Sequence, residues 1–148
     1  MPRKAIRAKR VKQLARPGVA ALGPAERPLK TRSAEDARAF AVDVARLLHD
    51  DKCEDVVILD LRGISPICDF FVIGSGTSDR QIRAVAGHVE ALGRARDDPP
   101  FSMTGYDDGK WAVIDFVDVV IHLFDPEQRD YYGLETLWGD GPRVEWNR

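Results

Sequence analysis

The spacing of hydrophobic residues changes several times between residues 33 and 140, and each change predicts a different element. After the segment Ser33-Ala34-Glu35-Asp36, apolar residues recur every three or four positions, which is typical of an amphipathic helix that begins at a serine N-cap. The same spacing returns after Ser78. The pattern therefore predicts one helix over about 34–50 and a second over about 79–94.

Shorter segments rich in β-branched and aromatic residues predict strands. They cover residues 56–61 (VVILDL), 70–75 (FFVIGS), 102–106, 111–116 and 119–124. Between the third and the fourth, Asp107-Asp108-Gly109-Lys110 has the composition of a hairpin turn, with glycine supplying a positive φ. Asp125 and Pro126 are typical of a helix start, and we expect this last helix to reach about Trp138.

The resulting order of elements, α-β-β-α-β-β-β-α, predicts an α+β fold with a single mixed β-sheet of about five strands and helices packed on it. We expect one domain over residues 33–140, preceded by an N-terminal extension (1–32) and followed by a C-terminal tail (141–148). Cys53 and Cys68 have no CxxC partner, so we expect them to be buried free thiols.

Charge separates the extension from the domain. Residues 1–32 hold ten Lys or Arg and one acid, whereas residues 33–148 hold 12 basic and 23 acidic residues, which gives the domain and tail a net charge of −11. The proline-rich basic extension has the composition of a disordered segment. Three interpretations of it remain open: a solvated extension without function, an arm that contacts nucleic acid, and a transit peptide, the last disfavoured by the lack of serine.

The glycine-rich segment VIGSGTSDRQ (72–81) lies between a predicted strand and a predicted helix, where many proteins bind phosphate. A dinucleotide fingerprint requires a third glycine at the position of Asp79, and a P-loop requires a lysine that is absent from this segment. Ser78 and Gln81 instead match a capping box, and Gly74 and Gly76 permit close packing. We therefore interpret this segment as a structural turn.

A Gly-Ser pair before a helix is also found in nucleotidyltransferases, whose chemistry requires two carboxylates at positions i and i+2 of a strand so that both face the metal ions. Asp115 and Asp118 are three residues apart, which would turn them to opposite faces of a continuous strand. His49, His88 and His122 lie on separate predicted elements. We expect no catalytic residues, no metal site, no cofactor and no enzyme activity.

Three longer segments resemble the ribosomal silencing factor family, also called RsfS or Iojap-like proteins: DLRGISPICDFFVIGSGTSDRQ, GYDDGKWAVIDFVDVVIHLF and RDYYGLETLW. The resemblance implies a nucleotidyltransferase-like topology without the catalytic carboxylates. It also implies a cytoplasmic protein that binds the large ribosomal subunit through ribosomal protein uL14. Binding there blocks association with the small subunit and represses translation when nutrients are limiting. The alternative is a large-subunit assembly factor that uses the same contact. No membrane or small-molecule substrate is implied.

Period-two alternation places Trp111 and Asp115 on one face of their strand, and the more apolar set, Ala112, Ile114 and Phe116, on the face toward the helices. We expect Trp111 and Asp115 to form an exposed aromatic and charged pair that contacts the partner. The resemblance adds six positions with partner-binding roles: Tyr106, Asp118, His122, Arg129, Tyr132 and Glu135. Three structural alternatives stay open, namely that Trp111 packs the hairpin, that Arg129 and Glu135 form internal ion pairs, and that Tyr132 docks the last helix.

One departure from the family concerns the turn between the last two strands, where Val117 occupies a position that is usually glycine. Valine tolerates positive φ poorly, so we expect a turn of different shape or greater length before Asp118. The acidic domain should favour a basic ribosomal protein over bare RNA, and the basic extension should add non-specific contact with nearby ribosomal RNA.

Overall fold

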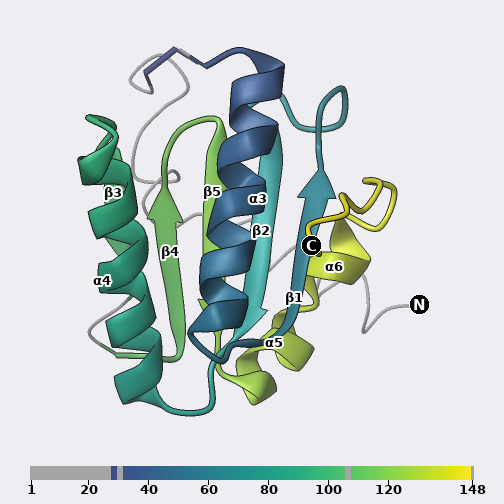
Figure 1. Cartoon of the computed structure of the whole chain (residues 1–148). Helices are drawn as coiled ribbons and strands as arrows, with labels where there is room; N and C mark the ends of the chain where they lie inside the picture. Colours follow the sequence, from purple (N-terminus) through teal and green to yellow (C-terminus); the bar gives the residue numbers. More distant parts are fainter. Residues whose placement is uncertain (1–27, 30–31, 106–107, 148) are drawn as a thin grey trace.

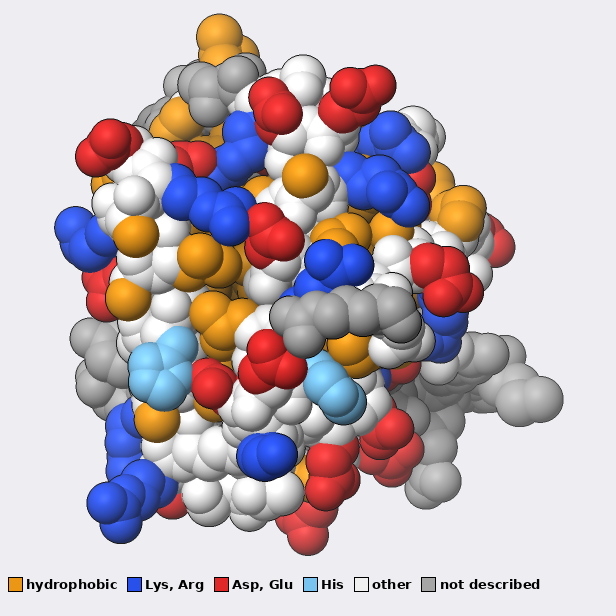
Figure 2. All heavy atoms as spheres, viewed as in Figure 1, with side chains coloured by type: hydrophobic (Ala, Val, Ile, Leu, Met, Phe, Trp, Pro, Cys, Tyr) orange, Lys and Arg blue, Asp and Glu red, His pale blue; other side chains and the backbone are white. Residues whose placement is uncertain are grey.

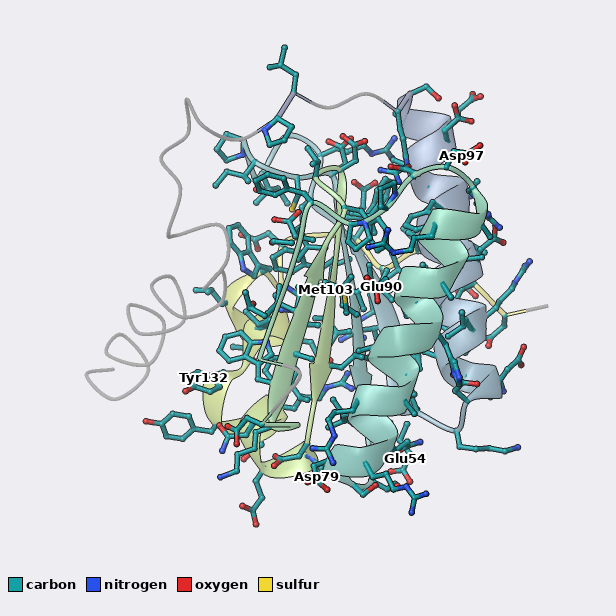
Figure 3. The ribbon with its side chains drawn as sticks, turned by 90° about the vertical axis from the view of Figure 1, so that its left-hand side faces the viewer. Glu54, Asp79, Glu90, Asp97, Met103 and Tyr132 are labelled. Atoms are coloured by element: carbon teal, nitrogen blue, oxygen red, sulfur yellow. The ribbon has the colours of Figure 1, made fainter. Side chains whose placement is uncertain are left out.

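The computed structural model describes residues 28–29, 32–105 and 108–147. A five-stranded sheet forms its centre, with two long helices on one face and two short helices on the other (Figures 1 and 3). The long helices are α3 (Ala34–Asp50) and α4 (Asp79–Ala95), and the short ones are α5 (Pro126–Tyr132) and α6 (Leu134–Leu137). The predicted α+β fold is confirmed.

The sheet is mixed, as predicted, and its strands follow the order β1-β2-β5-β4-β3. Strands β2 and β5 pair in parallel, and the other neighbouring pairs are antiparallel. The strands are β1 (Glu54–Asp60), β2 (Phe70–Ser75), β3 (Ser102–Thr104), β4 (Trp111–Asp115) and β5 (Val119–Phe124). The parallel pair at the centre is buried on both faces, which accounts for the nearly continuous apolar sequences of β2 and β5.

Both long helices begin at the predicted serine caps. The Ser33 hydroxyl accepts a hydrogen bond from the Asp36 amide, and the Ser78 hydroxyl accepts one from the Gln81 amide at 3.0 Å. The Gln81 side chain reaches back to the Thr77 amide rather than to that of Ser78, and its Nε2 donates to the Asp51 carbonyl after α3. The cap of α4 thereby ties the two helices together.

The two faces of the sheet build separate hydrophobic clusters. Ala112, Ile114 and Phe116 pack with α3 and α4, as the alternation predicts. Trp111 and Val113 point to the opposite face, which carries α5 and α6. Figure 3 shows this division, with Glu90 of α4 and Tyr132 of α5 on opposite sides of the sheet. One face of the sheet is thus covered by long helices, and the other is covered at one end by short ones.

The prediction of one continuous last helix to Trp138 is wrong. Gly133 adopts the left-handed conformation, with φ of 59°, and its amide closes α5 by donating to the Arg129 carbonyl. The chain turns there and continues as the single turn α6. Because the turn redirects the chain, Leu134 is buried against the sheet face that carries Trp111.

Residues 142–146, which we call the C-terminal strap, lie along the outer edge of β1. The Asp60 amide donates to the Pro142 carbonyl at 2.8 Å, and the Val144 amide donates to the Ile58 carbonyl at 3.0 Å. The Trp146 indole donates to the Val56 carbonyl, and the Arg46 Nε donates to the Trp146 carbonyl. The strap pairs with an edge strand whose backbone groups would otherwise be open to another chain.

The turn between β4 and β5 is short, so the greater length that was one of the two expected alternatives is not observed. Val117 adopts a φ of 75°, and the Asp118 amide donates to the Phe116 carbonyl two residues earlier, which is the bonding pattern of a γ-turn. A γ-turn with positive φ is strained for a β-branched residue. The Asp115 carboxylate accepts from the Val117 amide at 2.8 Å and helps to hold this conformation.

We predict that Val117→Gly stabilises the protein by about 1 kcal/mol, because relief of the backbone strain exceeds the extra chain entropy that glycine brings to the unfolded state. Urea unfolding followed by circular dichroism measures the difference. Gly63, which also has a positive φ of 80°, offers the matched opposite change: Gly63→Val should destabilise. A Val117→Gly variant that unfolds at a lower urea concentration than the wild type would contradict the assignment of strain.

Candidate functional site

Trp111 lies at the centre of a group of aromatic rings on the sheet face opposite α3 and α4. We call Trp111, His122, Phe124, Tyr131 and Tyr132 the aromatic cluster. The indole stacks on Phe124 with ring centroids 4.9 Å apart and contacts Tyr132 at 4.5 Å. Tyr131 packs edge-on against Tyr132 and is 45% exposed. The cluster thus runs from a buried strand to the protein surface.

The rings come together because two elements meet at this point. Trp111 begins β4 and is the register partner of Phe124, the last residue of β5. Asp125 then caps α5 by accepting from the Gln128 amide, and Pro126 occupies the first turn, so the helix begins directly after the strand. Tyr131 and Tyr132 at the end of α5 are thereby returned to the face that carries Trp111. The sequence prediction of partner-contacting residues did not include Tyr131, although its neighbour in the Tyr-Tyr pair was included.

His122 is fully buried beside Trp111. Its Nδ1 atom accepts a hydrogen bond from the Trp111 indole N–H at 3.2 Å. Its ring also packs edge-on against Phe71 of β2, with centroids 4.5 Å apart, and Phe71 in turn contacts Trp138. His122 therefore supports the aromatic cluster from within and presents no side-chain surface of its own.

The expectation that Asp115 is exposed beside Trp111 is wrong. Asp115 shares the face of Trp111, as alternation requires, but it is 0% exposed, and its carboxylate accepts from the Val117 amide. Asp118 is also 0% exposed, and its Oδ2 atom accepts from the backbone and the guanidinium of Arg32. Both carboxylates belong to the support of the β4–β5 turn, because alternation fixes the face of a side chain but not what covers it.

Arg129 and Glu135 form an internal ion pair, which was one of the alternatives left open by the sequence. The Arg129 Nε donates to the Glu135 carboxylate at 2.7 Å, and its Nη1 donates to the Ser75 hydroxyl at 2.9 Å. The Arg129 side chain is 11% exposed. These bonds fix α5 and α6 against the end of β2. Tyr106 and residues 1–27 of the extension lie outside the described residues, so their expected contacts stay predictions.

Arg32 was assigned to the extension from its sequence, yet it is bound to the folded domain. Its guanidinium pairs with Asp98 and Asp118, donates to the Phe116 carbonyl at 3.1 Å, and lies 4.7 Å from the centroid of the Phe40 ring. Its side chain is 11% exposed. Periodicity cannot reveal this role, because every partner of Arg32 lies outside its own element.

The glycine-rich turn after β2 is closely packed. A Cβ atom on Gly76 would lie 2.4 Å from the Ile82 side chain, and one on Gly74 would lie 3.1 Å from that of Leu48. Gly109 of the following hairpin, with φ of 70°, packs against Asp79 at the start of α4. Gly74 and Gly76 are needed because a larger side chain would not fit, and phosphate binding is not required to explain them. The β3–β4 hairpin packs against the N-terminus of α4.

A cavity of about 770 Å³ opens next to this turn, lined in part by Ser75, Arg129, Glu135 and Arg143. The Ser75 hydroxyl and Glu135 already bind Arg129. Across the described residues no group of three or more His, Cys, Asp or Glu side chains has the geometry to bind a metal ion, and no helix there is long and apolar enough to span a membrane. Cys53 is buried, and burial, followed by the charge of Asp51, raises the pKa of its thiol to about 11, which keeps it protonated.

Comparison with known proteins assigns this arrangement to a family. The model of the family described as "Ribosomal silencing factor during starvation" matches residues 34–148. The chain belongs to the ribosomal silencing factor (RsfS) family. The matched region begins at the first residue of α3 and includes the aromatic cluster, the β4–β5 turn and the C-terminal strap.

Individual RsfS-family relatives agree in sequence and in structure. The ribosomal silencing factor RsfS of Halalkalibacterium halodurans is 43% identical over 98 residues, which cover 66% of this chain and 84% of that protein. The mouse protein named "Mitochondrial assembly of ribosomal large subunit protein 1" is 35% identical over 103 residues, which cover 67% of this chain and 45% of the mouse protein. A crystal structure from Bacillus halodurans superposes with a TM-score of 0.63 at 36% identity, covering 75% of this chain and 98% of that one.

Proposed function

We propose that this RsfS-family protein binds the large ribosomal subunit through ribosomal protein uL14, and that it thereby blocks association with the small subunit and represses translation when nutrients are limiting. The proposal rests on family membership, which supplies the ribosomal silencing role. The identity of the partner protein and the mechanism of blocking are the parts that require a test.

The observation that favours the aromatic cluster as the contact surface is its gradient of exposure. Tyr131 is exposed, Trp111 and Tyr132 are half-buried, and His122 and Phe124 are fully buried. Interface hot spots are enriched in Trp and Tyr side chains that are rigidly held and only partly covered in the free protein. We propose that Trp111, Tyr131 and Tyr132 touch the partner, and that Asp115, Asp118, His122, Arg129 and Glu135 act by holding this surface in place.

Charge around the aromatic cluster supports a basic protein as the partner. Glu127 and Asp130 are exposed on α5, and their spacing places them on the same side of the helix as the exposed Tyr131. The helix face of the molecule, in contrast, carries interspersed acidic and basic side chains without a uniform patch (Figure 2). An acidic rim would repel bare RNA and attract the Lys and Arg side chains of a ribosomal protein, which speeds association and fixes orientation.

A second candidate function is assembly of the large subunit through the same contact. The name of the mouse relative favours it, because that protein is described by its role in assembly of the mitochondrial large subunit. The two functions require the same surface and differ in the state of the ribosomal particle that is bound. Binding to mature subunits supports silencing, whereas binding confined to immature particles supports assembly.

The direct test of the partner is sedimentation of the purified chain with isolated large subunits and, separately, gel filtration with purified uL14. The proposal predicts co-migration in both experiments. Failure to bind mature subunits would refute silencing, and binding to subunits but not to uL14 would refute the choice of partner. A thermal shift with ATP or CTP and Mg²⁺ tests the nucleotidyltransferase alternative, and the proposal predicts an unchanged Tm.

We also predict that deletion of residues 1–27 weakens binding to large subunits mainly at low salt. The extension is strongly basic, and non-specific contact with phosphates weakens as salt concentration rises. The deletion stops before Arg32, because Arg32 pairs with Asp118 inside the domain. Affinity is measured by sedimentation at about 50 and about 200 mM salt, because screening of charges increases strongly between these concentrations. Equal affinity of both chains at the lower salt would contradict an RNA-contacting role.

A further inference from the structure

The orientation of the Trp111 side chain depends on the protonation state of one residue. The indole N–H of Trp111 has only a donor function, and it points at the Nδ1 atom of His122, 3.2 Å away. A nitrogen that accepts this bond carries no proton, so the imidazole is neutral and holds its proton at Nε2. Protonation of Nδ1 would set two donors against each other and remove the bond.

His122 is held so that it cannot relieve such a conflict by turning into solvent. It is 0% exposed, its cross-strand partners are Val113 on β4 and Ile73 on β2, and its ring packs against Phe71 and lies parallel to Phe124. The indole is the more mobile partner, because Trp111 is only half-buried and lies at the first residue of β4. Loss of the bond should therefore displace the indole rather than the imidazole.

Ionisable side chains on or beside the sheet face that carries His122 come from several elements. On β4, Asp115 lies two residues beyond Val113 on the same face, and its carboxylate favours a positive charge nearby. From the β1–β2 loop and α5 come the Cys68 thiol and the Tyr132 phenol, which carry no charge in acid. From α5 and α6, Arg129 and Glu135 pair with each other. Burial opposes a positive charge on the imidazole, and the buried Asp115 carboxylate on the same face of the sheet favours one.

We propose that His122 is a positioning residue for Trp111, and that its protonation releases the indole and weakens binding through the aromatic cluster. The effect on binding rests on the proposed function. The hydrogen bond between His122 and Trp111 can be tested without it. The partner would therefore be bound at neutral pH, where the His122–Trp111 bond is intact, and released in acid. His122, which was expected to touch the partner, would instead control the orientation of Trp111, which we propose touches it.

The link between His122 and Trp111 is tested by NMR on the full-length ¹⁵N-labelled chain, which needs no ribosome. The Trp111 indole N–H resonance is assigned by its loss in Trp111→Phe and followed from about pH 8 to 5, a range centred on the ordinary titration of histidine. We expect one sigmoidal transition of this resonance in the wild type. A resonance that does not move across this range would overturn the inference.

Two substitutions of His122 separate positioning from packing. In His122→Asn the amide oxygen occupies a position close to that of Nδ1 and accepts the indole bond at every pH, so the transition should vanish. His122→Phe keeps a ring but has no acceptor, so the indole should show its released resonance at every pH. His88→Gln is the matched control, because His88 pairs with Asp51 on the helix side of the sheet. A transition retained in His122→Asn, or lost in His88→Gln, would contradict the inference.

Binding to large subunits then tests the functional consequence. Between pH 8 and 5.5 the affinity of the wild type should fall roughly tenfold, which is the order that one hydrogen bond contributes. His122→Asn should lose much less over the same range, which separates the effect of His122 from titration of the ribosome itself. An equal fall in both chains would overturn control by His122. Absence of binding at any pH would instead refute the proposed function, and the NMR result would still decide the positioning role.

Discussion

Arg32→Ala is expected to lower the free energy of unfolding by about 3–5 kcal/mol, the largest loss of stability that we predict for a single substitution outside the hydrophobic core. Asp118 is 0% exposed, and its Oδ2 atom accepts from the Arg32 backbone amide at 3.2 Å and from the guanidinium at 3.3 Å. Removal of the guanidinium leaves a buried carboxylate without its cation. It also removes the bond to the Phe116 carbonyl in the strained turn.

The measurement is urea unfolding, with Arg62→Ala as the matched control. Arg62 also pairs with an aspartate and lies over an aromatic ring, but its side chain is 44% exposed, so its loss should lower stability far less than the loss of Arg32. Combining Arg32→Ala with Asp118→Asn should recover part of the loss, because the uncompensated charge is then absent. Equal losses of unfolding free energy in Arg32→Ala and Arg62→Ala would show that the buried Arg32–Asp118 pair stabilises the protein no more than the exposed Arg62–Asp60 pair.

Trp111→Ala is expected to weaken binding to the large subunit by at least roughly 30-fold, which corresponds to about 2 kcal/mol and is typical of an aromatic hot spot. The substitution removes the ring that connects Tyr132 to Phe124 and His122. Tyr131 and Tyr132 then lose their support, so the contact surface is lost together with the contact itself. Trp111→Phe keeps part of the stacking and should give an intermediate loss.

The substitution will also destabilise the domain, so a control of similar stability cost is required. Trp146 provides it, because this residue is likewise half-buried and donates its indole N–H to a backbone carbonyl, but it lies in the C-terminal strap on the edge of β1. Trp146→Ala should lower stability while leaving the affinity for large subunits within about twofold of the wild type, since surface away from an interface contributes little. Equal losses of affinity in the two variants would contradict the assignment of the contact surface.

Much of the fold could be predicted from sequence because its elements follow simple periods. The helical spacing after Ser33 and Ser78 and the apolar segments of β2 and β5 each point to one structure, and the caps agree with them. The break at Gly133 was missed because RDYYGLETLW carries helix-forming residues on both sides of the glycine. The pairing of the C-terminal strap with β1 was not predicted for a different reason. Its hydrogen bonds are made to β1 and α3, far away in sequence, and leave no local pattern.

The candidate site was predictable in part. Alternation assigned Trp111 to the face opposite the long helices, and the family motif drew attention to Tyr132. Alternation could not show that Asp115 is covered, because coverage depends on the turn and on elements outside the strand. Arg32 pairs with Asp118, and the Trp111 indole donates a hydrogen bond to His122, only because the fold brings separate elements together. Sequence patterns thus led to the candidate surface, and they assigned to direct contact residues that the structure buries, such as Asp115 and His122.

The most direct test of the account is the joining of ribosomal subunits in the presence of the purified chain. Isolated large subunits are first saturated with the wild type or with Trp111→Ala, small subunits are added, and the mixture is separated on a sucrose gradient. We predict that the wild type keeps the subunits apart and that Trp111→Ala lets them join. Full joining in the presence of saturating wild-type protein would contradict the account.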